Sequence, residues 1–349
     1  MKTKFKIFAL LIVILLTSGC GTSNYIKDED KNIVKFEATG QVLQKDIICL
    51  PEKDSELYKT YEKYKDQLKY DFEDLPSCSD YNLSATKSSG LWEWAFVKPL
   101  AYLILKLGNV VGNLGVSLIL IGLAIRLILL PFTIKSSSQT ANMRKAQPEI
   151  EKIERKYRNR TDNESLMAKS QETMLIYKKY KVNPLLGCLM AFIQLPLFFA
   201  FLQAIYRTPA IYEETLFSFD LGMTPLVGIQ NGNYLYLILL ILIGISTYFS
   251  FKQTMNQAPQ TTPEAGKQMK TMLYVMLVII VYASLTLPTA LAFYWIVTYA
   301  FIAIQNIVIN MFNNRSLTNK PKKKKEEKKR EKIKEKLMKK EGMKYGKNS

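Results

Sequence analysis

The chain has 349 residues, 48% of them hydrophobic, and carries 48 Lys and Arg against 30 Asp and Glu, a formal net charge of +18. The apolar residues form long blocks separated by charged stretches, which excludes an ordinary soluble domain and predicts an all-α polytopic membrane protein. The absence of histidine removes Ser-His and Cys-His catalysis and HExxH zinc sites. The four cysteines show no CxxC spacing and there is no GxxxxGK[ST] run, so we expect no enzyme activity, no metal and no cofactor.

Residues 1–20 have the pattern of a bacterial lipoprotein signal peptide. Lysines precede a short apolar run, Phe8 to Leu16, which is shorter than a membrane span requires. The run ends in Thr17-Ser18-Gly19-Cys20, which resembles a lipobox in which Cys20 would be diacylated and become the mature N-terminus. The alternatives are an ordinary signal peptide and an uncleaved membrane anchor.

Residues 21–90 form a polar segment with 10 Lys against 14 Asp and Glu, a balance that suits the outer face of a cell membrane. Cys49 and Cys78 would lie there on the oxidising side. The sequence leaves open whether they form a disulfide or stay free, because spacing does not determine connectivity. The next run, residues 91–107, begins with Trp92 and Trp94, and we expect a helix lying on the outer membrane surface.

Five apolar runs are suited to cross the bilayer as helices, which takes roughly 20 residues each. They are residues 112–134, 185–206, 234–251, 271–287 and 289–312. We expect residues 135–183, between the first two spans, to form a two-helix cytoplasmic hairpin in which Pro148 occupies the first turn of a new helix. The hairpin, the loop 252–270 and the tail 313–349 are all rich in Lys and Arg. The positive-inside rule therefore places them in the cytoplasm and the mature N-terminus outside.

Arg126 is the one charged residue within the first of these spans. An arginine at mid-depth costs roughly 2.5–3.5 kcal/mol on insertion scales, and such a charge normally faces protein or water. No Asp or Glu lies within any of the five spans, so Arg126 lacks a fixed partner of opposite charge. Two interpretations are open: a hydrated pocket that attracts acidic groups of another molecule, or a side chain that snorkels toward the cytoplasmic headgroups.

Several runs of sequence match one family. They are Arg126 to Lys135, Met143 to Tyr157, YKKYKVNPLLGC at 177–188, IQLP at 193–196, FDLG at 219–222, and Pro288 to Trp295 followed by Gln305. With these runs the chain resembles the YidC/Oxa1/Alb3 membrane protein insertases in their Gram-positive lipoprotein form, over about residues 91–312. The resemblance implies a groove formed by five spans, open to the cytoplasm and to lipid and closed outside.

The resemblance also implies a function. The chain would be an insertase and chaperone that inserts and helps fold integral membrane proteins, alone or with the Sec translocon. Arg126 would keep the groove wet and attract acidic residues of the substrate. Gln194 and Gln305 would line the groove, and Tyr294 and Trp295 would contact the nascent membrane protein.

The basic tail, residues 313–349, would be a ribosome contact, since phosphate-rich RNA attracts Lys and Arg. A solvated charge run and binding to anionic lipid are the alternatives for the tail. The rival for the whole chain is a small-molecule or anion transporter with Arg126 as its binding site, and the absence of inverted repeats counts against it.

The chain departs from the family pattern at two places near the expected groove. Thr298-Tyr299 stands where the family often has asparagine, and Gly122 stands where a polar side chain often precedes the arginine by one turn. Both departures reduce the expected polarity of the groove. The resemblance does not cover the outer segment up to Gly90.

Overall fold

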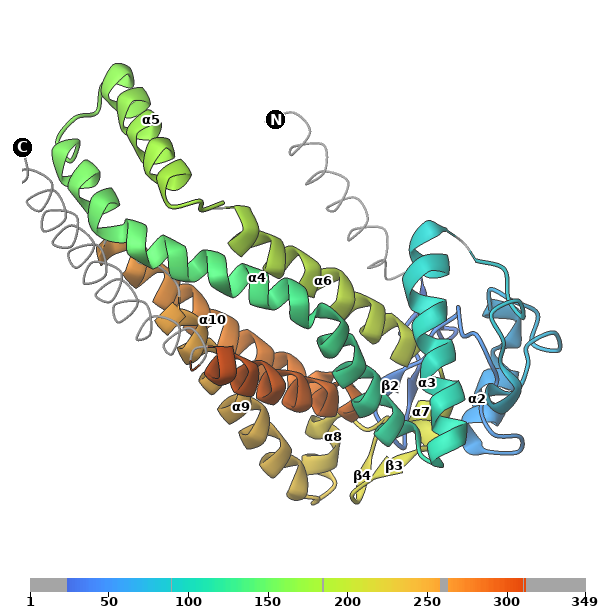
Figure 1. The fold of residues 1–349 in the computed structure, drawn as a ribbon. Helices are drawn as coiled ribbons and strands as arrows, with labels where there is room; N and C mark the ends of the chain where they lie inside the picture. The colour runs from blue at the N-terminus through green and yellow to red at the C-terminus, as the bar shows by residue number, and fades with distance from the viewer. Residues whose placement is uncertain (1–23, 89, 184, 258–262, 310, 312–349) are drawn as a thin grey trace, which may run out of the picture. The chain divides into compact units, whose positions relative to one another are not determined.

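The computed structural model describes residues 24–88, 90–183, 185–257, 263–309 and 311. It divides the chain into two units, residues 1–303 and 304–349. The signal peptide with Cys20 and the basic tail 313–349 lie outside the described residues, so their predictions stand as made. The described part of the first unit is mostly helical, with two small two-stranded sheets (Figure 1).

In chain order the elements are β1 (Lys35–Phe36), β2 (Gln41–Val42), α2 (Glu56–Lys63), two 3₁₀ turns (Lys65–Gln67 and Cys78–Asp80), a π-helical turn (Glu93–Val97), α3 (Lys98–Val111), α4 (Leu114–Lys156), α5 (Asn163–Lys179), α6 (Leu185–Tyr206), α7 (Ala210–Glu213), β3 (Thr215–Leu216), β4 (Phe219–Asp220), α8 (Pro225–Gln230), α9 (Leu235–Gln257) and α10 (Pro263–Thr286). A last helix spans Thr289–Ile309.

The N-terminal segment, defined here as residues 24–88, is folded around its own apolar residues. Those that are at most 6% exposed include Ile26, Leu43, Ile47, Ile48, Leu57, Tyr61, Phe72, Leu75 and Tyr81. A disulfide joins Cys49 to Cys78, with 4.8 Å between the two Cα atoms. Ser55 caps α2 by accepting a hydrogen bond from the Tyr58 amide. Although this segment is polar in composition, it therefore contains a small apolar core that is cross-linked by a disulfide.

A tight turn joins α3 to α4. Gly112 ends α3 in the left-handed conformation at φ +75°, which a glycine adopts without a Cβ penalty. Asn113 then caps α4 by accepting a hydrogen bond from the Val116 amide. The two helices pack together, and the Ser117 hydroxyl donates to the Ile104 carbonyl at 2.7 Å.

Helix α4 runs for 43 residues without a break, through both Pro131 and Pro148. The expectation that Pro148 starts a new helix is wrong. A proline inside a helix removes one backbone hydrogen bond, and here apolar residues on both sides of it, Ala146 and Ile150, are buried at 0% and 2% exposure. The packing of those neighbours outweighs the lost bond, so the apolar run and the polar stretch after it form one continuous helix.

The C-terminal part of α4 and helix α5 lie antiparallel. Two ion pairs join them: Lys156 Nζ lies 2.6 Å from Glu172 Oε1, and Lys179 Nζ lies 2.6 Å from Glu149 Oε1. Asp162 caps α5 by accepting a hydrogen bond from the Ser165 amide. Exposed ion pairs of this kind contribute little free energy, so the pairing depends mainly on the buried face of α4. The cytoplasmic location of this helix pair stays a prediction.

Four helices in the described part of the chain are long and apolar enough to cross a membrane: Glu93–Val111, α4, Leu235–Met255 and Thr289–Ile309. The last three overlap predicted spans, although α4 continues past residue 134 to Lys156. The described apolar parts of the other two predicted spans, Gln194–Tyr206 and Lys270–Thr286, are shorter. The number of five spans and the surface location of residues 91–107 therefore stay predictions, while a multi-pass helical membrane protein is established.

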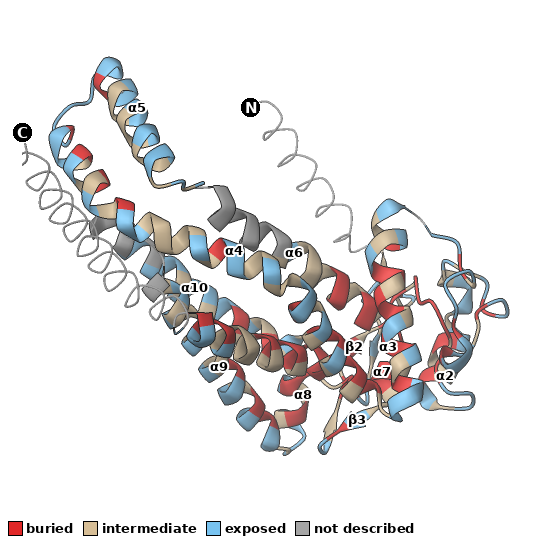
Figure 2. Ribbon diagram, in the orientation of Figure 1, coloured by how far each residue is buried: buried red, intermediate tan, exposed pale blue. Residues whose placement is uncertain are grey.

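Burial is uneven along the helices. Figure 2 shows buried residues gathered where α3, α7 and β2 meet, and mostly exposed or half-buried residues along α9 and α10. The exposed side chains of these two helices are largely apolar and include Leu237, Ile238, Ile241, Leu242, Ile245, Phe249, Val275, Val278, Ile279 and Tyr282. Apolar faces this extensive are typical of helices whose solvent is lipid.

Candidate functional site

Helix α4 meets α6 and the last helix near the middle of its apolar part. Helices α4 and α6 run side by side (Figure 1). The last helix approaches α4 at Gly122, where an added Cβ would lie 3.2 Å from Cδ2 of Tyr294. A residue with a side chain would have to displace the ring. Gly122 therefore lets Tyr294 lie directly against α4, one turn before Arg126.

Arg126 is 7% exposed, and its side chain points toward α6. Its Nη2 donates a hydrogen bond to the Gln194 Oε1 at 2.7 Å. Its Nε has no hydrogen-bond partner among the described residues. A neutral amide satisfies one donor of the guanidinium but supplies no opposite charge, so the positive charge of Arg126 is uncompensated within the part of the chain that the structure describes.

Tyr294 supplies a second polar group at this place. The residue is 1% exposed, and its hydroxyl lies near Arg126, Gln194 and Thr298. Within the described residues, neither this hydroxyl nor the buried Thr298 hydroxyl makes a hydrogen bond of good geometry. Buried polar groups normally find a partner in protein or in ordered water. Arg126 Nε and the hydroxyls of Tyr294 and Thr298 can therefore still form hydrogen bonds with water or with a polar ligand.

Aromatic rings of α6 and the last helix stack beside these polar groups. The Phe201 ring lies 4.2 Å from the Tyr294 ring, and the Phe198 ring lies 5.6 Å from the Trp295 ring, centroid to centroid. Both stacks lie one to two turns along α6 from Gln194. They fix Tyr294 and Trp295 against α6, so the site is held by packing on its apolar side.

The structure brings together three of the five groove residues expected from the sequence: Arg126, Gln194 and Tyr294. Trp295 lies beside them through its stack on Phe198. Gln305 belongs to the second unit, and its place in a groove stays a prediction. No group of three or more His, Cys, Asp or Glu side chains in the described residues could hold a metal ion.

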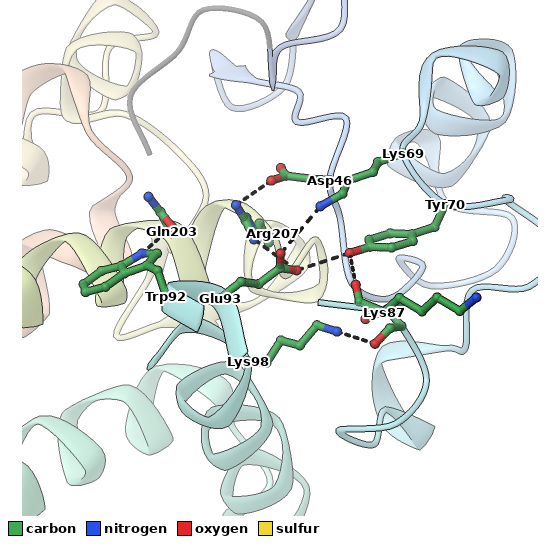
Figure 3. Close-up of polar contacts among 10 residues, drawn as sticks. Asp46, Lys69, Tyr70, Lys87, Trp92, Glu93, Lys98, Gln203 and Arg207 are labelled. Atoms are coloured by element: carbon green, nitrogen blue, oxygen red, sulfur yellow. Dashed lines mark hydrogen bonds and ion pairs between the residues drawn. The ribbon is translucent and has the colours of Figure 1, made fainter. Parts of the chain in front are cut away.

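A second buried arginine, which sequence reasoning missed, lies at the end of α6 (Figure 3). Arg207 is 8% exposed. Its Nη2 lies 2.5 Å from the Asp46 Oδ2, and its Nη1 lies 3.4 Å from the Glu93 Oε1. The other oxygen of Glu93 lies 3.5 Å from Lys69 Nζ. This arginine therefore has two buried carboxylates as partners.

The surrounding contacts fasten the N-terminal segment to the π-helical turn and α3, and they join Trp92 to α6 (Figure 3). The Tyr70 hydroxyl lies 2.5 Å from the Lys87 carbonyl oxygen and 3.2 Å from Glu93 Oε1. Trp92 Nε1 donates to Gln203 Oε1 at 3.0 Å, and Lys98 Nζ donates to the Thr86 carbonyl. Burial raises the pKa of the Asp46 carboxyl above its usual range, although Arg207 and Lys69 oppose this shift.

Comparisons with known proteins identify the family of this chain. The family model described as "60Kd inner membrane protein" matches residues 106–320. A membrane protein insertase YidC of Oceanobacillus iheyensis is 34% identical over 240 residues, covering 68% of this chain and 90% of that protein. The membrane protein insertase MisCA of Bacillus subtilis is 35% identical over 237 residues, covering 67% of this chain and 85% of the relative.

A solved structure titled "Active YidC insertase crystal structure with the first transmembrane domain resolved" is also similar. The sequences are 25% identical and the TM-score is 0.44, with 65% of this chain covered. The match spans 48% of that protein's chain. The family-model match extends over more than half of this chain and begins at residue 106, so the N-terminal segment lies outside it. By the family-model match and the two sequence relatives, the chain belongs to the YidC/Oxa1/Alb3 family of membrane protein insertases.

Proposed function

We propose that this chain inserts membrane proteins by drawing their acidic segments toward Arg126 in a hydrated intramembrane groove. The observation that carries the proposal is the burial of Arg126 with only a neutral partner among the residues that the structure describes. A charge buried in this way is costly, and intramembrane charges that persist usually serve a function. The chain belongs to a family of membrane protein insertases, so we infer that this function is the insertion of membrane proteins.

Unused hydrogen-bonding capacity supports a wet site. Arg126 Nε, the Tyr294 hydroxyl and the Thr298 hydroxyl are buried without a hydrogen-bond partner among the described residues. On α9, the Thr247 hydroxyl and the Gln253 Oε1 are in the same condition. Water is the simplest partner for such groups, because an unsatisfied buried polar group costs about 1–3 kcal/mol. We infer that polar faces of α4, α9 and the last helix line a hydrated space.

The charge would act on the part of the substrate that must cross. A carboxylate 4 Å from the guanidinium gains roughly 4 kcal/mol at an effective dielectric constant of 20. This gain offsets part of the cost of moving a polar tail into the membrane. Water inside the groove shortens the apolar distance that the tail must cross, and burial of the apolar substrate helix in lipid then drives its release. No step requires bond chemistry.

The partners follow from the same proposal. Nascent membrane proteins would be the substrates, and the basic tail 313–349 would contact the ribosome. Cooperation with the Sec translocon, diacylation at Cys20 and an outside N-terminus with a cytoplasmic C-terminus are parts of the proposal that rest on the sequence. No observation in the structure or among the relatives favours the transporter alternative.

Complementation of an insertase-depleted bacterium tests the role of Arg126. The substrate is a single-span protein with an acidic tail on the outside, and the chain is supplied as wild type, Arg126→Lys or Arg126→Ala. We expect insertion with wild type and Arg126→Lys and a severe loss with Arg126→Ala. A second substrate whose tail carries no acidic residue serves as the control, and its insertion should depend less on Arg126.

The outcomes separate the class of function from the site. Equal insertion by all three variants would retain the insertase and remove Arg126 from its mechanism. Failure of the wild type, at normal levels in the membrane, would contradict the insertase function of this chain. Each variant is therefore quantified in the membrane fraction before its activity is compared.

A further inference from the structure

The turn between β3 and β4 places a large apolar side chain in an unfavourable position. The strands pair Thr215 with Asp220 and Leu216 with Phe219, which leaves Phe217 and Ser218 as the two turn residues. Both have positive φ, at +50° and +69°. Turns of this kind favour Asn and Gly because a bulky side chain is strained there. Phe217 is nevertheless 75% exposed, so contacts within the described structure offset little of this strain.

The β3–β4 hairpin lies at the same level as the first turns of α4, α9 and the last helix. Leu216 packs against Gly115 in the first turn of α4, where an added Cβ would lie 2.9 Å from the Leu216 Cβ. The Phe219 ring lies 5.2 Å from the ring of Tyr236 near the start of α9. The Phe217 ring lies 6.4 Å from the ring of Phe293, one turn into the last helix. The tip is therefore level with the ends of the apolar helices.

The surroundings of the tip match the boundary of a bilayer. Residues 215–219 carry no charge. Neighbouring helix ends also expose apolar or aromatic side chains. Val110, near the end of α3, is 77% exposed, and Tyr234, just before α9, is 68% exposed. Asn113, at the start of α4, donates to the Thr215 carbonyl at 2.9 Å, which ties the hairpin to this end. Aromatic side chains are enriched where helices leave the hydrocarbon.

We propose that Phe217 is a lipid anchor that inserts into the headgroup–acyl boundary of the bilayer at this end of the helices. Lipid is the occupant because the tip continues the apolar surface of helices that themselves face lipid. The hairpin, attached to the start of α4 through Asn113 and Gly115, holds the ring outward, and burial of the ring in the boundary compensates the strain of the turn. The anchor would fix the depth at which α4, α9 and the last helix sit in the membrane.

The test measures the depth of a label at the tip in the full chain, reconstituted in phosphatidylglycerol and phosphatidylcholine vesicles. Phe217→Cys is made in a background with Cys20→Ser and Cys188→Ser, which retains the disulfide, and is labelled with an environment-sensitive fluorophore. Lys59→Cys, exposed on α2 of the N-terminal segment, is the matched control. We expect a blue-shifted emission at position 217, strong quenching by lipids carrying a quencher near the headgroup, and a several-fold weaker quenching by iodide than at position 59.

Two results would overturn the proposal. One is iodide quenching at position 217 as strong as at position 59, which would place the tip in water. The other is protection from iodide without quenching by the lipid-borne group, which would place the tip against protein. If Phe217→Cys does not fold, Ser218→Cys in the same turn replaces it, and the same outcomes decide.

Discussion

The two buried arginines of this chain are nearly equal in exposure and opposite in surroundings. Arg126 and Arg207 are 7% and 8% exposed. Arg207 lies between the carboxylates of Asp46 and Glu93. Arg126 instead donates a hydrogen bond to the neutral amide of Gln194. Removing one partner of a buried ion pair is strongly destabilising, whereas an intramembrane charge with no opposite charge among the described residues is a candidate for a functional role. The comparison separates a structural arginine from one proposed to act in function.

The largest effect should come from removing the paired arginine. Arg207→Met leaves two buried carboxylates facing each other, and breaking a buried pair in this way costs about 3–5 kcal/mol. The free energy of unfolding in detergent, followed by denaturant titration, measures the loss. Arg126→Met is the matched control, and it should change stability much less because no counter-charge among the described residues is left behind. A similar destabilisation by both variants would end the distinction.

Removal of the disulfide should have the second largest effect on stability. Cys49 and Cys78 are separated by 29 positions, and removing a bridge that closes a loop of this size costs roughly 3–4 kcal/mol. Cys49 lies one residue from Ile48, whose amide donates to the Arg207 carbonyl at 3.0 Å. The double variant Cys49→Ser, Cys78→Ser should therefore loosen the Arg207 side of the molecule. Limited proteolysis should cleave residues 24–88 faster in the double variant, with the helices around Arg126 unchanged; equal cleavage of the double variant and the wild type would contradict this.

A smaller effect is expected at the close approach beside Arg126. Gly122→Ala would put a Cβ 3.2 Å from the Tyr294 ring, and overpacking of this kind costs about 1–3 kcal/mol. The ring must shift by a few tenths of an ångström, and we expect insertion of the acidic-tail substrate to fall although Arg126 is present. The control is Gly244→Ala on α9, where the nearest atom to an added Cβ is 3.9 Å away. Equal activity of both variants would show that the approach of Tyr294 is not needed.

The smallest effect concerns the charge of Asp46. Burial raises its pKa above the ordinary aspartate value of 3.8, so the folded state binds its proton more tightly than the unfolded state does. The stability that Asp46 contributes is then fully present below pH 3.8 and is lost as pH rises through the folded pKa. Asp46→Asn, which cannot ionise, should remove this part of the pH dependence. Thermal unfolding of both proteins between pH 4 and pH 7 measures the difference; parallel curves would contradict the shift.

The sequence predicted much of the site around Arg126 and little of the site around Arg207. Arg126, Gln194 and Tyr294 lie in motifs whose order along the chain could be matched to a family. Arg207 appeared as the single base in a loop with three acids, residues 207–233. Its real partners, Asp46 and Glu93, are distant in sequence, and no local pattern links them. A long-range ion pair leaves no periodic signal, which explains the omission.

Two local predictions show where pattern reasoning has limits. Pro148 favours a helix start by its missing amide, but the packing of Ala146 and Ile150 carries α4 through it. In the sequence, Gly122 stood out only because the family often has a polar side chain at this position. Its contact with Tyr294 depends on the approach of two helices, which composition and spacing do not contain. Tertiary packing decided both positions.

The attachment of the N-terminal segment has a consequence for chimeras between relatives. The family-model match begins at residue 106, so sequence boundaries suggest that residues 24–88 could be deleted or transplanted as a module. Their contacts argue otherwise, because removing Asp46 and Lys69 strips Arg207 and Glu93 of partners inside the remaining protein. A workable exchange would have to carry residues 92–98 and position 207 along with the segment. Residues 24–88 and the helices that they contact are therefore a single unit for engineering.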